Sequence, residues 1–185
     1  MNVAKYIQEK GVKHAIQVIY QYKIDIVLQK ILGVFLRNKP LKDIIMIESH
    51  NDFDSNGGAF YNYLIQNEYN KKYKIVWLIK HKESLNVQLP KNVAYVMQYK
   101  PSLKKNYYRW LAKWLTADND CSDKLRDDQI SIYFGHGGFG LKNCKGYIDV
   151  PDKVDYVCMP SHFLKDIFAD QFNLTGNDPR LCFIG

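Results

Sequence analysis

A glycine-dense turn with a single histidine is the part of the chain best suited to chemistry. It follows an apolar run that begins at Ile130, and glycines stand at positions 135, 137, 138 and 140. Glycines let a ligand approach the backbone closely, and successive N–H groups before a short helix form an anion cradle. His136, at the apex of the turn, could take a proton from an attacking hydroxyl at neutral pH. The turn therefore indicates chemistry on a phosphate, unless its histidine only bonds locally.

The same glycines formally match the dinucleotide-binding pattern G-x-G-x-x-G. That reading needs a helix of several turns and an acidic residue at the end of the next strand. Here a short stretch precedes Gly146, and Asp155 opens the following strand instead of closing it. We expect no nicotinamide cofactor.

Two other patterns suggest further ligands, and each has a plainer explanation. His50, Asp52 and Asp54 offer metal ligands, but a loop rich in Asp and Asn after a strand is commonly turn chemistry. Cations between residues 100 and 113 interleave with aromatic residues, as in nucleic-acid-binding proteins. Those aromatic residues fall on an apolar stripe, so the cations suit a solvated face or the steering of a polyanionic substrate. We expect neither a metal nor a nucleic acid partner.

Short apolar strands alternate with helical stretches after Pro40 and must position these loops. We expect strands at 44–48, 74–79, 93–97, 130–134, 154–159 and 181–184, helices at 59–68, 102–115 and 162–172, and an acidic surface loop at 118–129. This pattern predicts an α/β fold, a mostly parallel Rossmann-like sheet with helices on both faces. Ligands of such sheets lie beyond the carboxyl ends of the strands. That edge would hold loops 49–58, 135–141 and 159–163, and with them Asn51, His136 and Ser161.

The N-terminal segment is both basic and apolar. Residues 1–42 hold eight Lys or Arg against two acidic residues, so they contribute +6 of the net charge of +7. Apolar residues from Ile16 to Phe35 recur at helical spacing, and Lys23, Asp25 and Lys30 keep the run below transmembrane length. We expect residues 1–42 to be a basic amphipathic helical appendage on a domain spanning 43–185. Its partner would be an anionic membrane surface, or else it packs on the domain with its lysines in water.

Composition and cysteine usage fit a cytoplasmic globular domain. Hydrophobic residues make up 46% of the chain and charged residues 24%. The four cysteines lack metal-ligand spacing, and Cys158 and Cys182 lie in strand-like runs as expected of buried reduced thiols. The chain stops at Gly185, directly after an apparent strand, so we expect it to be the front part of a longer protein.

Several short segments, in this order, resemble the CDP-glycerol:poly(glycerophosphate) glycerophosphotransferases, which include teichoic acid polymerases, primases and capsule enzymes. The segments are Glu48-Ser49, Asn56, Tyr63-Leu64, Tyr73–Trp77, His136-Gly137, Leu141-Lys142, Val154–Ser161 and Phe183–Gly185. The resemblance covers roughly residues 44 to 185. The histidine loop departs from the family pattern, because it is one residue longer and lacks a Thr-Pro pair.

The resemblance implies the N-terminal, acceptor-side domain of a two-domain GT-B transferase. An acceptor hydroxyl would attack the β-phosphate of CDP-glycerol, or of a related CDP-polyol, and release CMP. His136 would be the general base, the amides of Gly137 and Gly138 would face phosphate oxygens, and Lys142 would add a positive charge. We assign Asn51 and Ser161 to substrate binding at the same edge. A lipid-linked polymer would be the acceptor, at the inner face of the cell membrane, with no cofactor beyond the donor substrate.

Two other functions stay open at this point. The N-terminal half of a GT-B glycosyltransferase that uses a nucleotide sugar shares this layout. A non-catalytic, membrane-associated module could use the loop to bind an anion only. If the donor-binding domain is indeed outside the chain, the 185 residues alone should be inactive.

Overall fold

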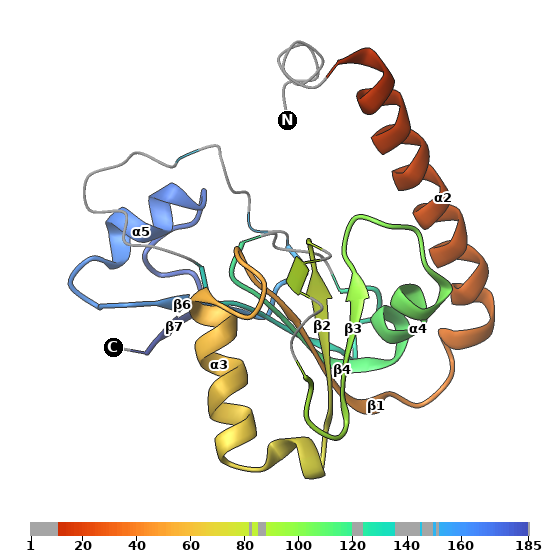
Figure 1. Ribbon diagram of the computed structural model, residues 1–185. Coiled ribbons are helices and arrows are strands. Elements are labelled where there is room, and N and C mark those ends of the chain that lie inside the picture. The colour runs from red at the N-terminus through yellow and green to blue at the C-terminus, as the bar shows by residue number, and fades with distance from the viewer. Residues whose placement is uncertain are drawn as a thin grey trace.

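The computed structural model describes residues 11–81, 83–84, 88–119, 124–135, 145, 150 and 152–184. They form a seven-stranded sheet in the order β3-β2-β1-β4-β5-β6-β7 (Figure 1), and all neighbouring strands are parallel. The strands are β1 (Lys42–Glu48), β2 (Lys74–Ile79), β3 (Val93–Met97), β4 (Ala112–Ala117), β5 (Ile130–Tyr133), β6 (Tyr156–Met159) and β7 (Leu181–Phe183). The expected parallel Rossmann-like sheet is confirmed.

β1 shows how helices cover both faces of the sheet. Side chains alternate between the two faces of a strand. Ile44 and Met46 pack in one apolar cluster with Tyr108 of α4 (Leu103–Leu111), whereas Ile45 packs in another with Leu64 of α3 (Ser55–Gln66). The strand is therefore buried on both sides, which explains its continuous apolar run. The remaining helices are the short η1 (Tyr69–Lys71), α5 (Lys165–Gln171) and the long α2 (Val12–Leu36).

The helix expected at 102–115 is wrong in its second half. α4 ends at Leu111, and the backbone passes directly into β4, where Ala112 is extended with φ −64° and ψ 134°. β4 lies between β1 and β5, at the centre of the sheet. Trp114 and Leu115 continue the helical spacing of apolar residues, but they also fit a strand with two covered faces. Pairing with β1 on one side and β5 on the other decides between the two.

The segment 118–129, expected to be an acidic surface loop, begins and ends in the interior. Asp118 is 0% exposed and Gln129 is 1% exposed. The Gln129 amide donates to the backbone oxygens of Arg109 (2.7 Å) and Ala112 (2.8 Å), and its oxygen accepts from the backbone N–H groups of Leu125 and Arg126. Gln129 thus satisfies the carbonyls that the break between α4 and β4 would leave without partners.

α2 lies against α4 along its second half (Figure 1). Asp25 forms a 2.8 Å ion pair with Lys105, and burial lowers the pKa of that lysine even though Asp25 opposes the shift. Trp110 donates to the backbone oxygen of Gln29 at 2.8 Å. Its ring lies so close to Gly33 that a Cβ there would come within 2.4 Å of it. Within the described residues, no helix is both long and apolar enough to span a bilayer.

Candidate functional site

The direction in which successive strands are added to the sheet reverses between β1 and β4. The chain builds outward from β1 to β2 and β3, then returns to place β4 on the other side of β1. The loops that leave two such strands diverge, and ligands of open α/β sheets bind in the crevice between them. Ser49 and His50 follow β1 at this point, and Asp118 and Asn119 follow β4.

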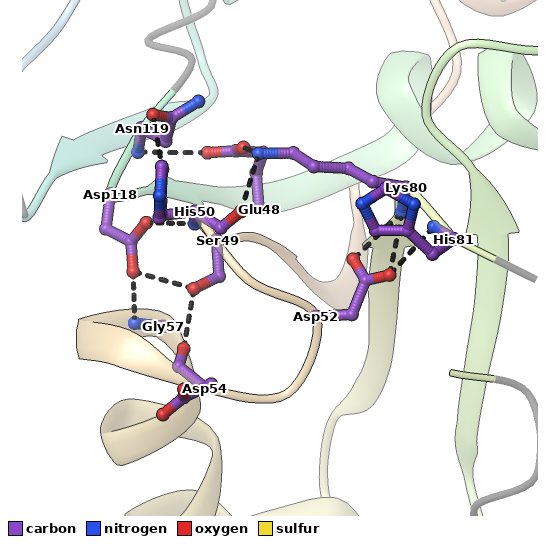
Figure 2. Close-up of polar contacts among 10 residues, drawn as sticks. All are labelled: Glu48, Ser49, His50, Asp52, Asp54, Gly57, Lys80, His81, Asp118 and Asn119. Carbon is purple, nitrogen blue, oxygen red and sulfur yellow. Dashed lines mark hydrogen bonds and ion pairs between the residues drawn. The ribbon is translucent and has the colours of Figure 1, made fainter. Parts of the chain in front are cut away.

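Asp118 ties the ends of the two strands together (Figure 2). Its carboxylate accepts from the Ser49 hydroxyl at 2.7 Å, from the His50 backbone N–H at 2.5 Å and from the Gly57 backbone N–H at 2.8 Å. Gly57 is the third residue of α3, so the carboxylate also meets the positive end of that helix. Asp118 therefore fixes the loop between β1 and α3 at both its beginning and its end.

A buried ion pair extends this network towards β2. The Glu48 and Lys80 side chains are 3% and 8% exposed, and their charged atoms are 2.8 Å apart. The second Glu48 oxygen accepts from the backbone N–H of Asn119 at 3.1 Å, and Lys80 donates to the backbone oxygen of His50 at 3.3 Å. The carboxyl ends of β2, β1 and β4 are thus held by charge-assisted contacts.

The His50 ring lies at the exposed side of this network. Its Nδ1 is 3.0 Å from the side-chain oxygen of Asn119. This contact joins the loop after β1 to the loop after β4 on the exposed side of the network.

Asp52 points away from Asp118, towards the end of β2 (Figure 2). Its carboxylate accepts from the backbone N–H groups of Lys80 (2.8 Å) and His81 (2.9 Å) and from the Ser84 hydroxyl (2.7 Å). The Asp54 backbone oxygen accepts from Ser49 at 2.6 Å. The pattern His50-x-Asp52-x-Asp54 therefore serves loop structure, and the described residues contain no cluster of three or more potential metal ligands.

The histidine loop begins beside this network. His136, Gly137, Gly138 and Lys142 lie outside the described residues. Gly135, directly before them, is buried with a φ of +64° that glycine adopts readily. Its backbone oxygen accepts from the Asn56 side chain at 2.8 Å. The loop therefore starts at the carboxyl edge, as expected, and α3 holds its first residue.

The two other residues assigned to substrate binding are also at this edge, but the sheet keeps them apart. The exposed Asn51 follows β1, and its backbone oxygen accepts from Asp54 N–H in a turn. Ser161 follows β6, and its hydroxyl accepts from the Phe163 N–H at 3.1 Å. β1 and β6 are three strand spacings apart, or about 14 Å. The structure does not bring Asn51 and Ser161 together.

Sequence reasoning missed the buried part of the site. The sequence predicts a surface loop for Asp118 and Asn119, because part of the strand before them also fits the helix expected at 102–115. One signal was present, since polar residues directly follow the apolar run from Trp114 to Ala117, as they follow β1. Lys80, at the end of β2, was not singled out.

Comparison with known proteins identifies the architecture. No protein-family model matches the chain, and no curated protein sequence matches it significantly. Among solved structures, a histidine-to-asparagine variant of the wall teichoic acid polymerase TagF, soaked with CDPG, matches at a TM-score of 0.62 and 18% identity. The fold is similar to that of TagF.

The similarity covers 90% of this chain and 48% of that TagF chain. A TagF structure without a named substitution matches at a TM-score of 0.61 and 17% sequence identity, and a histidine-to-alanine variant gives the same two values. The chain thus spans about half the length of these TagF structures. At this identity the comparison shows the fold, and it agrees with the resemblance found in the sequence.

Proposed function

We propose that the chain is the acceptor-side domain of a transferase that moves glycerol phosphate, or a related polyol phosphate, from a CDP-linked donor to a teichoic-acid-like or capsular polymer. One observation carries the proposal. The histidine loop begins at the carboxyl edge of a TagF-like sheet, close to the ends of β1 and β4, where the order of the strands reverses. Four of the similar TagF structures carry a histidine substitution, and two of those four were soaked with CDPG, which supports a histidine and a CDP-linked donor in the reaction.

In the proposed reaction, an oxygen of the acceptor hydroxyl forms a bond to the β-phosphorus of the donor. The bond between that phosphorus and the bridging oxygen breaks, and CMP leaves with the electron pair. His136 takes the hydroxyl proton. The amides of Gly137 and Gly138 and the Lys142 ammonium stabilise charge on the phosphate oxygens, so catalysis rests on positioning and electrostatics. Asn51 and Ser161, on strands far apart, would contact different parts of an extended substrate.

The Asp118 network has a supporting role in this proposal. The network holds the loop after β1, the start of α3 and the ends of β1, β2 and β4 in one arrangement. α3 in turn carries Asn56, whose amide bonds to the residue before His136. A rigid edge of this kind keeps the loop within the small tolerance that phosphoryl transfer requires.

The test is CMP release from labelled CDP-glycerol in the presence of a lipid-linked acceptor, using the longest protein that contains this chain. We expect His136→Ala to lower turnover about 10²–10⁴-fold, as for a lost general base, with little change in donor affinity. We expect the 185-residue chain alone to release no CMP. Unchanged turnover in the variant would reject the role of His136. Transfer from a nucleotide sugar in place of CDP-glycerol would instead establish a GT-B glycosyltransferase.

We also propose that α2 binds the surface of an anionic membrane. Asp25 is the one acidic residue of this helix, and Lys105 pairs with it on the inner side. At 100° per residue, the opposite face carries Lys13, Lys23 and Lys30 together with large apolar side chains that are 47–69% exposed. Those side chains are Ile16, Ile19, Tyr20, Val27, Ile31 and Val34. Apolar residues mixed with cations suit the interface of an anionic bilayer.

A further inference from the structure

A pocket of about 340 Å³ opens at the edge of the sheet opposite the candidate site. It is lined by residues where β1 and β2 begin and by two tyrosines of α4. β1 separates this pocket from the Asp118 network by its own length of seven residues, or about 20 Å. The pocket is therefore a separate place on the molecule.

Unneutralised positive charge surrounds this pocket. Lys42, Lys72 and Lys74 line it, against a single carboxylate from Asp43. Among the described residues, none of these three lysines lies within ion-pair distance of a carboxylate, although eight other cations do. Three cations and one anion leave a formal charge of +2 at the pocket.

Tyrosine rings hold each of the three ammonium groups. Lys42 lies 5.3 Å from the centre of the Tyr107 ring, and Lys74 lies 6.0 Å from that of Tyr108. Lys72 lies 5.2 Å from the centre of the Tyr73 ring. A cation–π contact positions an ammonium group and leaves its charge available to a ligand. These contacts orient the three ammonium groups at the pocket and leave their charges available to an anion.

The phenol groups add neutral donors. Lys42 donates to the Tyr107 hydroxyl oxygen at 2.6 Å, so the hydroxyl proton can be donated to another acceptor. Burial is the main cause that raises the pKa of Tyr108, so this phenol stays protonated at neutral pH. Ammonium groups beside phenol O–H groups match the several acceptor oxygens of a phosphate.

We propose that this pocket binds the phosphate group of a glycerol phosphodiester. The chemistry of the pocket rests on its own residues, and only the source of the ligand rests on the proposed function. A transferase of this kind would make a polyanion, and the growing polymer would be the source. A second binding site for the polymer, about 20 Å from the site of the reaction, would keep the polymer bound to the protein between transfers.

The test is a calorimetric titration of the chain with inorganic phosphate, and with glycerophosphoglycerol, at constant ionic strength. We expect saturable binding to one site. Lys74→Gln removes an ammonium group, and Tyr107→Phe removes a hydroxyl while keeping the ring. Each should weaken binding about tenfold. Lys71→Gln is the matched control, because it makes the same charge change next to Lys72 in a residue already paired with Glu68 at 2.5 Å.

Absence of saturable binding, or an equal loss in Lys71→Gln, would overturn the proposal. So would binding to phosphatidylglycerol vesicles with none to soluble glycerophosphoglycerol, because the phosphate would then be that of a lipid headgroup. Thermal unfolding of each variant separates lost binding from lost folding. The titration needs no donor and no turnover. If binding is found but the longer protein releases no CMP, the proposed phosphate site is supported and the proposed function is rejected.

Discussion

Asn56 joins the start of α3 to the histidine loop, 79 residues later in the sequence, because its amide donates to the Gly135 oxygen at 2.8 Å. We expect Asn56→Ala to lower kcat between about tenfold and a hundredfold, since the peptide before His136 would lose its support. The pH dependence of kcat should keep its shape, because the proposed base, His136, is itself unchanged. Steady-state kinetics across pH measure both effects.

The control for Asn56 is Asn67→Ala. Asn67 donates to the Tyr63 backbone oxygen at 2.9 Å, at the exposed far end of the same helix. It should leave kcat unchanged. Equal losses in the two variants would show that α3 stability, rather than the contact with Gly135, governs the rate.

The contacts of Asp118 lead to a prediction about the free energy of unfolding. Its carboxylate is fully buried and accepts three hydrogen bonds. Asp118→Asn would turn an N–H₂ group towards N–H donors, and we expect it to lower the free energy of unfolding by about 2–3 kcal/mol. Asp127→Asn, at a side chain 95% exposed, should change it little. Urea denaturation measures both, and a small effect at Asp118 would mean that the network can rearrange.

At the scale of elements, the break between α4 and β4 has its own test. Gln129 is 1% exposed, and its side chain makes four hydrogen bonds to the backbone. Two of them go to the Arg109 and Ala112 oxygens at this break, and two come from the loop before β5. Gln129→Ala leaves those groups without partners, and we expect it to lower the free energy of unfolding by about 3 kcal/mol. Gln66→Ala, at an exposed position, serves as the control in the same urea titration. Equal effects would show that Gln129 is not the support of the break.

The same break marks the limit of what the sequence could predict. β2 and β3 were predicted with the observed bounds, because apolar runs flanked by turns leave little choice. β4 was missed, since Trp114 and Leu115 fit the stripe of α4 and only the partner strands select the extended form. Because Asp118 directly follows β4, its buried position was missed as well. The general rule for parallel sheets was enough to predict the edge of the sheet at which the site lies. The buried network around Asp118 could not be predicted without knowing the order of the strands.

At the scale of the whole molecule, α2 gives a prediction about location. Replacing Lys13, Lys23 and Lys30 by Gln should weaken binding to phosphatidylglycerol vesicles about a hundredfold at low salt, at roughly 1 kcal/mol for each lysine near the surface. The effect should shrink as salt is added. Replacement is preferable to deletion, because α2 covers Lys105 and Trp110. Vesicle sedimentation measures the partition.

The matched control for α2 replaces the exposed Lys71, Lys91 and Lys113, which lie outside that helix. The two triple variants have the same net charge. Equal vesicle binding by both would show that total charge, and not the face of α2, sets the affinity.

The central place of β1 has a consequence for how the chain folds. β1 pairs with β2 about 30 residues later, but with β4 about 70 residues later. During synthesis from the N-terminus, β1, β2 and β3 can associate before β4 is complete. Until then, one side of an apolar strand presents unpaired backbone groups, which is the kind of edge that recruits strands from other chains. The nascent chain therefore keeps this edge open until residues 112–117 have been made and paired, and a chaperone that shields β1 would protect the chain during that interval.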